Sequence, residues 1–113
     1  MVIDMTNVNP VEFAKALADD TRQQIMKLCC CGWVSVSDFV QQLKVTQPTV
    51  SHHLAVLREA GLVKIREDGR QTFYILNQDR IASCCGQLVT RFAPLTDTAE
   101  ACRNIQITIK PDS

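Results

Sequence analysis

The chain has 113 residues, a length that predicts one domain with a modest core and no separate catalytic domain. Hydrophobic residues make up 46% and charged residues 21%, a balance that excludes a disordered chain. The 12 basic residues equal the 12 acidic ones, so the overall charge gives no general attraction to nucleic acid. No apolar run approaches the ~18 residues of a membrane span, and we expect no membrane partner.

The six cysteines are grouped along the chain. Cys29, Cys30 and Cys31 are consecutive, Cys84 and Cys85 are adjacent, and Cys102 stands apart. No signal peptide is visible in the first residues, so we expect a cytoplasmic protein whose thiols stay reduced. In that compartment, clustered cysteines are more typical of metal ligands or redox sensors than of structural disulfides.

Two helices are predicted at the N-terminal end. The first begins at Pro10 with Asn9 as its N-cap, because proline is favoured at the first helical position. The second begins at Asp19–Asp20 and ends at Gly32. Its buried face is expected to carry three apolar residues, namely Ile25, Leu28 and Cys29.

Two further helices follow with the spacing of a helix-turn-helix. Ser35, with Asp38 three residues later, caps the third helix. The fourth begins at Thr46-Gln47-Pro48, since proline is tolerated in a first turn, and Gly61 ends it. On a 100° wheel its buried face carries Val50, Leu54 and Leu57.

After this helix the hydrophobic period changes from helical to two. Residues 62–66 and 71–75 are β-type runs that flank Glu67-Asp68-Gly69-Arg70. An Asp-Gly pair between two such runs predicts a β-hairpin.

A last helix is capped by Asn77 and runs to about Ala93, before Pro94. The order of elements predicts a mainly α fold with a small β-hairpin, the winged helix-turn-helix. We expect this domain to span residues 1–93, and residues 94–113 to form a C-terminal tail.

The exposed face of the fourth helix carries short polar side chains near its start, as a major-groove reader requires. Candidate DNA contacts are Gln47, Thr49, Ser51 and His52 on this helix and Arg66, Arg70 and Gln71 on the hairpin. From Lys44 to Tyr74, five basic residues stand against three acidic ones, so the local charge is positive. His53 lies beside the apolar face, which predicts a half-buried structural histidine. The alternative is an ordinary solvated helix and hairpin.

The sequence resembles the ArsR/SmtB repressors over roughly residues 13–77. The resemblance is carried by the segments LADDTR (17–22), VTQPTVSHHL (45–54), LREAGLV (57–63) and REDGRQTFY (66–74). It implies a homodimer, paired through its first and last helices, that represses transcription by binding operator DNA and is released by an inducer.

The known inducer sites of these repressors are absent here. The arsenite site of the founding member resembles Cys-Val-Cys at the start of the third helix, where this chain has Ser35-Val36-Ser37. The zinc sites need paired Asp, His and Glu on the last helix, where Asp79 is the only acid. The cadmium–lead variant needs cysteines at positions that hold Val56 and Ala60.

The remaining candidate ligands are all thiols, which suits arsenite, antimonite or another thiophilic ion. Cys84 and Cys85 lie on the apolar stripe of the last helix with Ile81, Leu88 and Phe92, and Cys102 is placed to fold back as a third ligand. We therefore predict an As(III) or Sb(III) inducer site at Cys84, Cys85 and Cys102. Cys30 and Cys31 are the second choice. The alternative is that these cysteines are simply small buried apolar residues.

Three other functions remain open. A thiol-redox or persulfide-responsive repressor would pair a cysteine of the second helix with one of the last helix, but the corresponding second-helix position holds Lys27. Cys85 to Arg91 spells C-x5-R, which resembles a phosphatase or arsenate reductase loop. That loop must follow a strand, and here the match lies inside a predicted helix, so we expect no enzyme. The third alternative function is a thiol-rich metal buffer that does not bind DNA.

Overall fold

The structure is a computed structural model that describes residues 9–108, and the side chains of residues 9–102. The described chain divides into two compact units. One, here called the winged unit, is Ala14–Gln78. The other, the terminal unit, combines residues 9–13 with residues 79–108. The two units are described separately below.

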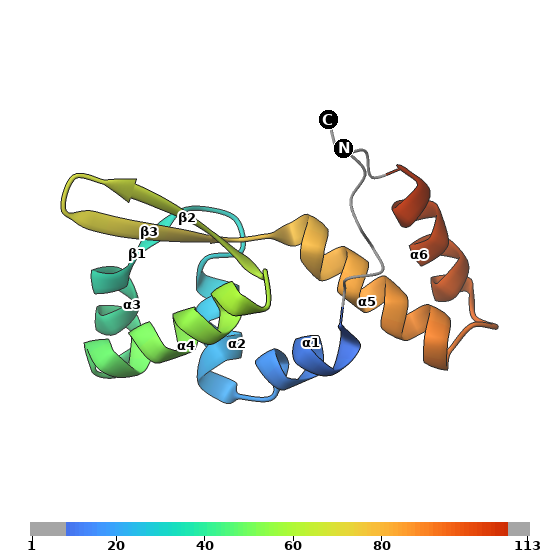
Figure 1. Ribbon diagram of the computed structural model, residues 1–113, viewed down its shortest axis with the longest axis horizontal. Coiled ribbons are helices and arrows are strands. Elements are labelled where there is room, and N and C mark those ends of the chain that lie inside the picture. The colour runs from blue at the N-terminus through green and yellow to red at the C-terminus, as the bar shows by residue number, and fades with distance from the viewer. Residues whose placement is uncertain (1–8, 109–113) are drawn as a thin grey trace. The chain divides into compact units, whose positions relative to one another are not determined.

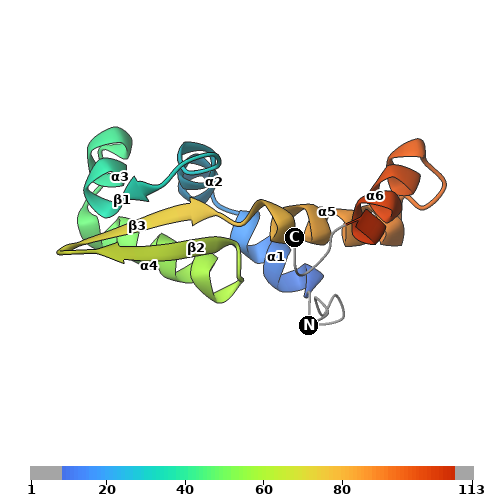
Figure 2. The ribbon, with the colours of Figure 1, turned by 90° about the horizontal axis from the view of Figure 1, so that it is seen from above.

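The winged unit holds most of the regular structure and begins inside the first helix. Its elements are α1 (Pro10–Leu17, shared with the terminal unit), α2 (Asp20–Leu28), β1 (Val34–Ser35), α3 (Val36–Leu43), α4 (Gln47–Glu59), β2 (Val63–Asp68) and β3 (Gln71–Leu76). The strands form an antiparallel sheet in the order β1-β3-β2. In both ribbon views the tip of the β2–β3 hairpin and the N-terminal end of α4 lie at the same end of this unit (Figures 1 and 2).

The predicted caps Asn9 and Ser35 are confirmed, and Asp19, at the predicted start of the second helix, also caps it. The Asn9 side chain accepts hydrogen bonds from the backbone N–H groups of Val11 and Glu12. The Asp19 carboxylate accepts from Arg22 at 3.0 Å, and the Ser35 hydroxyl accepts from Asp38 at 3.1 Å. Each bond satisfies a backbone donor that the first helical turn would otherwise leave unpaired.

The core of the winged unit contains the buried face predicted for α4. Val50, Leu54 and Leu57 are at most 1% exposed. They belong to a fully buried set that also includes Ile25, Cys29, Phe39 and Leu62. The fold class predicted from the sequence, a winged helix-turn-helix, is therefore confirmed.

The hairpin is longer and tighter than the sequence predicted. β2 continues to Asp68, which pairs with Gln71, so the turn consists of Gly69 and Arg70 alone. Gly69 has a φ of 63°, and it stands first of the two turn residues. Arg70, the second turn residue, does not have a positive φ. A two-residue turn with a positive φ only at its first position is the type II′ hairpin turn, for which glycine is preferred there.

One boundary and two further elements differ from the prediction. Helix α2 ends at Leu28 rather than at Gly32, and the short strand β1 follows before α3. The end of α5 (Gln78–Phe92) agrees with the predicted end at about Ala93. Within the predicted tail, α6 (Asp97–Thr108) forms a further helix, and residues 109–113 lie outside the described part of the chain. None of the described helices is both long and apolar enough to cross a membrane.

Candidate nucleic-acid interface and thiol sites

The start of α4 exposes the polar side chains that the sequence singled out. Gln47, Ser51 and His52 are exposed, whereas Thr49 is half-buried. The Thr49 hydroxyl lies 2.9 Å from that of Thr46, within hydrogen-bonding distance. Pro48 occupies the first turn, where the absence of its N–H costs no helical hydrogen bond. The first two turns of α4 therefore present a short polar surface to solvent.

A cavity joins this surface to the hairpin. It has a volume of about 170 Å³ and lies within the winged unit. Its lining comes from the starts of α3 and α4 and from the hairpin, with Ser35, Val36, Ser37, Gln47, Arg70, Gln71 and Thr72. Three of the predicted DNA contacts, Gln47, Arg70 and Gln71, therefore surround one polar cavity.

Arg66 has different surroundings. Its guanidinium lies 4.8 Å from the ring centre of Trp33 and 5.3 Å from that of Phe73. Phe73 is the cross-strand neighbour of Arg66, and Trp33 directly precedes β1. Both distances fall in the range of cation–π contacts. Arg66 is thus held on aromatic rings, and it does not line the cavity that contains Arg70.

His53 is a half-buried residue that ties helices together, as predicted. Its Nδ1 lies 3.0 Å from a guanidinium nitrogen of Arg22, and its Nε2 lies 3.9 Å from the Asp19 carboxylate. Burial lowers the pKa of His53, and the positive charge of Arg22 lowers it further, whereas Asp19 opposes the shift. A neutral ring allows Nδ1 to accept the hydrogen bond from Arg22. Arg22 also donates to the carbonyl of Ala16 at 2.8 Å.

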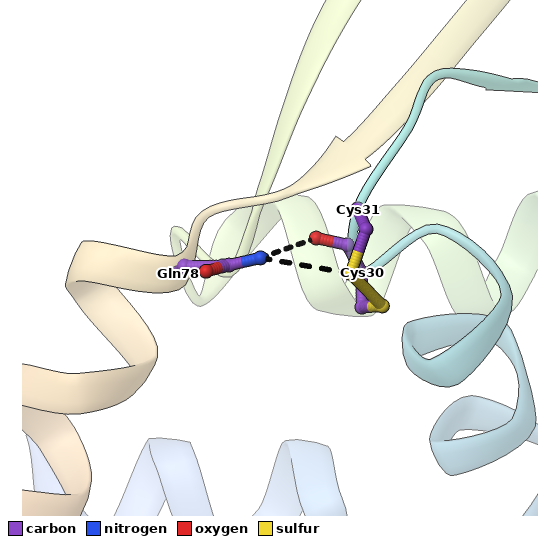
Figure 3. The surroundings of a disulfide bond; sticks show 3 residues. All are labelled: Cys30, Cys31 and Gln78. Carbon is purple, nitrogen blue, oxygen red and sulfur yellow. Dashed lines mark hydrogen bonds between the residues drawn. A yellow bond between two sulfur atoms is a disulfide. The ribbon is translucent and has the colours of Figure 1, made fainter.

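The three consecutive cysteines differ in accessibility. Cys29 caps α2 and is fully buried, and burial raises the pKa of its thiol to about 11. Cys30 and Cys31 follow in the turn, and their sulfur atoms are joined in a disulfide bond (Figure 3). The expectation that these thiols are reduced differs from the structure. As a disulfide, this pair offers no thiolate to a metal ion.

The thiols of the terminal unit lie on α5 and α6. Cys84 is buried, Cys85 is exposed and Cys102 is half-buried. Burial raises the pKa of Cys84, while the charge of Arg80 lowers it. Partial burial of its sulfur also raises the pKa of Cys85, and the neighbouring Cys102 raises it further. Cys85 and Cys102 are therefore close enough to interact electrically.

These three thiols are not assembled into a finished metal site. Among the side chains that the structure describes, no group of three His, Cys, Asp or Glu residues is positioned to hold one ion. An ion that binds Cys84, Cys85 and Cys102 together would have to draw the thiols closer. The sequence predicted that Cys102 folds back toward Cys84 and Cys85, and the three residues do belong to one unit, but the helix α6 that carries Cys102 was not predicted.

The C-x5-R segment from Cys85 to Arg91 lies wholly inside α5. Its backbone N–H groups are used within the helix, so the segment cannot cradle an oxyanion as a phosphatase loop does. A helix-turn-helix with an exposed polar second helix and a hairpin wing instead defines the class of winged-helix DNA-binding proteins.

Comparison with known proteins places the chain within this class. The profile described as the bacterial regulatory protein, arsR family, matches residues 19–64. The chain is 44% identical over 71 residues to an uncharacterized HTH-type transcriptional regulator of Methanocaldococcus jannaschii, covering 62% of this chain and 80% of that protein. It is 38% identical over 63 residues to an arsenical resistance operon repressor of Staphylococcus aureus, covering 56% of this chain and 61% of the relative.

A solved structure agrees with these matches. The transcriptional repressor BigR from Xylella fastidiosa is 34% identical with a TM-score of 0.59, over 74% of this chain and 85% of that one. The chain therefore belongs to the arsR family of bacterial regulatory proteins. It is a DNA-binding transcriptional regulator and not an enzyme.

Proposed function

We propose that the protein is a homodimeric repressor that leaves its operator when arsenite or antimonite binds Cys84, Cys85 and Cys102. The observation that carries the DNA-binding part is the polar cavity that brings Gln47, Arg70 and Gln71 together. The observation that carries the inducer part is that Cys84, Cys85 and Cys102 belong to one compact unit, in which Cys102 is near enough to raise the pKa of Cys85.

The DNA contacts divide into two kinds. Gln47, Thr49, Ser51 and His52 would face base edges, because the start of a recognition helix enters the major groove. Arg66, Arg70 and Gln71 on the hairpin would contact phosphates or the minor groove. The cavity beside Arg70 is polar and lies at the starts of α3 and α4, and the positive end of a helix dipole favours an anion. A DNA phosphate suits this position.

Dimer formation is supported by the exposed apolar side chains of the terminal unit. Val11 is 58% exposed, Phe92 75% and Leu95 98%. Phe92 ends the apolar stripe of α5 and Val11 lies on α1, and the family resemblance implies a dimer paired through these first and last helices. Apolar side chains gain free energy when a second copy removes them from water.

The pKa shifts of the thiols favour a metalloid over a divalent cation. Cys84 and Cys85 both have raised pKa values, so they carry protons at neutral pH. A divalent cation must displace these protons, which costs binding free energy. Neutral arsenous acid instead exchanges each hydroxide for a thiol sulfur and releases water, so the thiol protons are used in the reaction. The site is therefore suited to trivalent arsenic or antimony.

Release from DNA requires that the inducer bind the DNA-free arrangement more tightly. The residue before α5 is anchored to the end of the reading helix. The backbone N–H of Asn77 donates to Leu62 at 2.8 Å, and its side-chain amide donates to Gly61 at 3.4 Å. A change in α5 thereby acts on a segment fixed to α4. Coupling of about 1–3 kcal/mol is typical of such linked sites.

Two variants test the inducer site directly. The double variant Cys84→Ser/Cys85→Ser keeps DNA binding but loses bound arsenite in equilibrium dialysis and stays on operator DNA when arsenite is added. Cys30→Ser/Cys31→Ser is the matched control, and it keeps both arsenite binding and release. If the first variant is fully inducible and the second is not, the inducer site lies at Cys30 and Cys31, and the assignment is wrong.

A further inference from the structure

The turn after α2 contains a pair of cysteines that the proposed inducer site does not use. Cys30 and Cys31 are joined in a disulfide, and Cys31 is exposed, so solution reagents reach it. Their neighbour Cys29 is fully buried with a pKa of about 11 and is inert by comparison. Cys30 and Cys31 are therefore more accessible to solution reagents than Cys29, and they are the pair able to react.

Gln78 holds this turn from the first residue of α5. Its side-chain amide donates to the carbonyl of Cys30 at 2.7 Å and lies 4.0 Å from the Cys31 sulfur (Figure 3). The preceding carbonyl, that of Cys29, accepts from the N–H of Leu76 at 2.8 Å. The turn is thus fixed against the end of β3 and the start of α5, all within the winged unit.

The turn also connects to the wing. Two residues after Cys31, the Trp33 side chain stacks on the Arg66 guanidinium of β2. Trp33 then leads into β1, which pairs with β3 and ends at Ser35, the N-cap of α3. Only Gly32 separates the disulfide from this tryptophan. A change of backbone conformation at residues 30 and 31 therefore reaches Arg66 through a single stacked ring.

We propose that Cys30 and Cys31 form a reversible thiol–disulfide site whose state is transmitted to the wing through Trp33 and Arg66. This role goes beyond the inducer function and needs neither arsenite nor DNA. The oxidant is a low-molecular-weight disulfide, such as oxidised glutathione. The Cys31 thiolate attacks it and releases one small thiol, and the amide of Gln78 favours that thiolate as a hydrogen-bond donor.

The second step closes the ring. The Cys30 thiolate attacks the Cys31 sulfur of the mixed disulfide and expels the second small thiol. The two protons lost by the cysteines end on the two small thiols, and the two electrons reduce the small disulfide. The net change is one new sulfur–sulfur bond in the protein and one broken bond in the reagent.

Peptide mapping tests the site. The full protein is equilibrated in glutathione buffers of increasing oxidised fraction, blocked with iodoacetamide and digested with trypsin. Residues 28–44 form one tryptic peptide, separate from the peptides with Cys84, Cys85 and Cys102. As the oxidised fraction rises, we expect the form alkylated at Cys30 and Cys31 to be replaced by a disulfide form, two hydrogens lighter than the unmodified peptide. Cys29 should be alkylated only after unfolding. A peptide that stays fully reduced across the series would overturn the proposal.

Fluorescence tests transmission to the wing, because Trp33 is the single tryptophan of the chain. We expect the oxidised protein to emit less than the reduced protein, in step with the peptide signal, and Cys30→Ser to abolish this change. The control Cys85→Ser/Cys102→Ser should keep it. In Arg66→Gln the disulfide should still form while the emission change is reduced at least twofold. An undiminished change in Arg66→Gln would refute the path through Arg66, and a change that persists in Cys30→Ser would refute the site.

Discussion

The different chemistry of arsenite and cadmium at the same thiols gives a pH test of the inducer site. Cys84 and Cys85 have raised pKa values, so both carry protons throughout the neutral range. Cadmium must release these protons on binding, and its affinity therefore rises with pH. Arsenous acid is neutral and takes up the thiol protons as it forms water, so its affinity stays nearly constant.

The size of the effect follows from the number of protons. Each proton released changes the binding free energy by about 1.4 kcal/mol per pH unit. Cys84 and Cys85 alone, two of the three proposed ligands, therefore strengthen cadmium binding by at least about 2.7 kcal/mol, roughly a hundredfold, for one unit of rising pH. Arsenite affinity should change less than about twofold over the same interval, which is well under 1 kcal/mol.

Equilibrium dialysis of the Cys30→Ser/Cys31→Ser protein, with elemental analysis of both chambers, measures the two affinities at neutral pH and one unit below. This background removes the other reactive cysteines. The double variant Cys84→Ser/Cys85→Ser serves as the control. It should bind neither arsenite nor cadmium, so it should show no pH dependence of binding. Equal pH slopes for arsenite and cadmium would refute the assignment of protonated thiols as the ligands.

Three further predictions concern DNA binding, assembly and stability. Arg70→Ala should weaken binding to operator and to random DNA alike and lower the salt slope of binding by roughly one unit. His52→Ala should instead lose the preference for operator over random DNA in competition gel shifts. Wild-type operator binding by both variants would contradict the interface. Phe92→Asp should give a monomer, because the charge would be buried without a partner at the dimer interface. Its circular dichroism spectrum should be normal, because this side chain is 75% exposed in one copy. A dimer in sedimentation would show that Phe92 does not lie in the interface. Leu54→Ala should lower the free energy of unfolding by about 2–5 kcal/mol in urea titrations, because the side chain is 1% exposed; a loss below that range would contradict its core role.

Several local features of the fold were predictable because short-range rules determine them. Asn9, Asp19 and Ser35 cap helices through bonds to residues two or three positions away, which a pattern can reveal. The α4 face with Val50 and Leu54 follows from helical periodicity. The family resemblance added the expectation of a DNA-binding regulator.

The features that the sequence missed depend on residues far apart in the chain. β1 has two residues and exists only through its pairing with β3. The N–H of Leu76 donates a hydrogen bond to the carbonyl of Cys29, so the end of α2 is held by a residue far along the chain and not by a local stop signal. The contact of Trp33 with Arg66 is likewise non-local. α6 is an exception, because its start is capped locally: the Thr96 hydroxyl accepts a hydrogen bond from the Ala99 N–H, and the sequence analysis did not use this signal.

The position of Cys102 was only partly predictable. Spacing along the chain gave no reason to place it near Cys85 beyond the possibility of a returning segment. Cys102 lies on α6, near enough to Cys85 to add to the rise in its pKa that burial causes. Conversely, helical spacing placed Cys84 and Cys85 on one stripe, yet the structure buries the first and exposes the second.

The most direct test of the proposed function is the fluorescence anisotropy of a labelled duplex, selected from a random pool by binding to this protein, during titration with arsenite. We predict that the wild-type complex dissociates as arsenite is added. Affinity for the duplex should fall by roughly 5–150-fold at saturation, in line with coupling of about 1–3 kcal/mol. Anisotropy that stays at its bound value after the protein has taken up arsenite would contradict the proposal that this metalloid is the inducer.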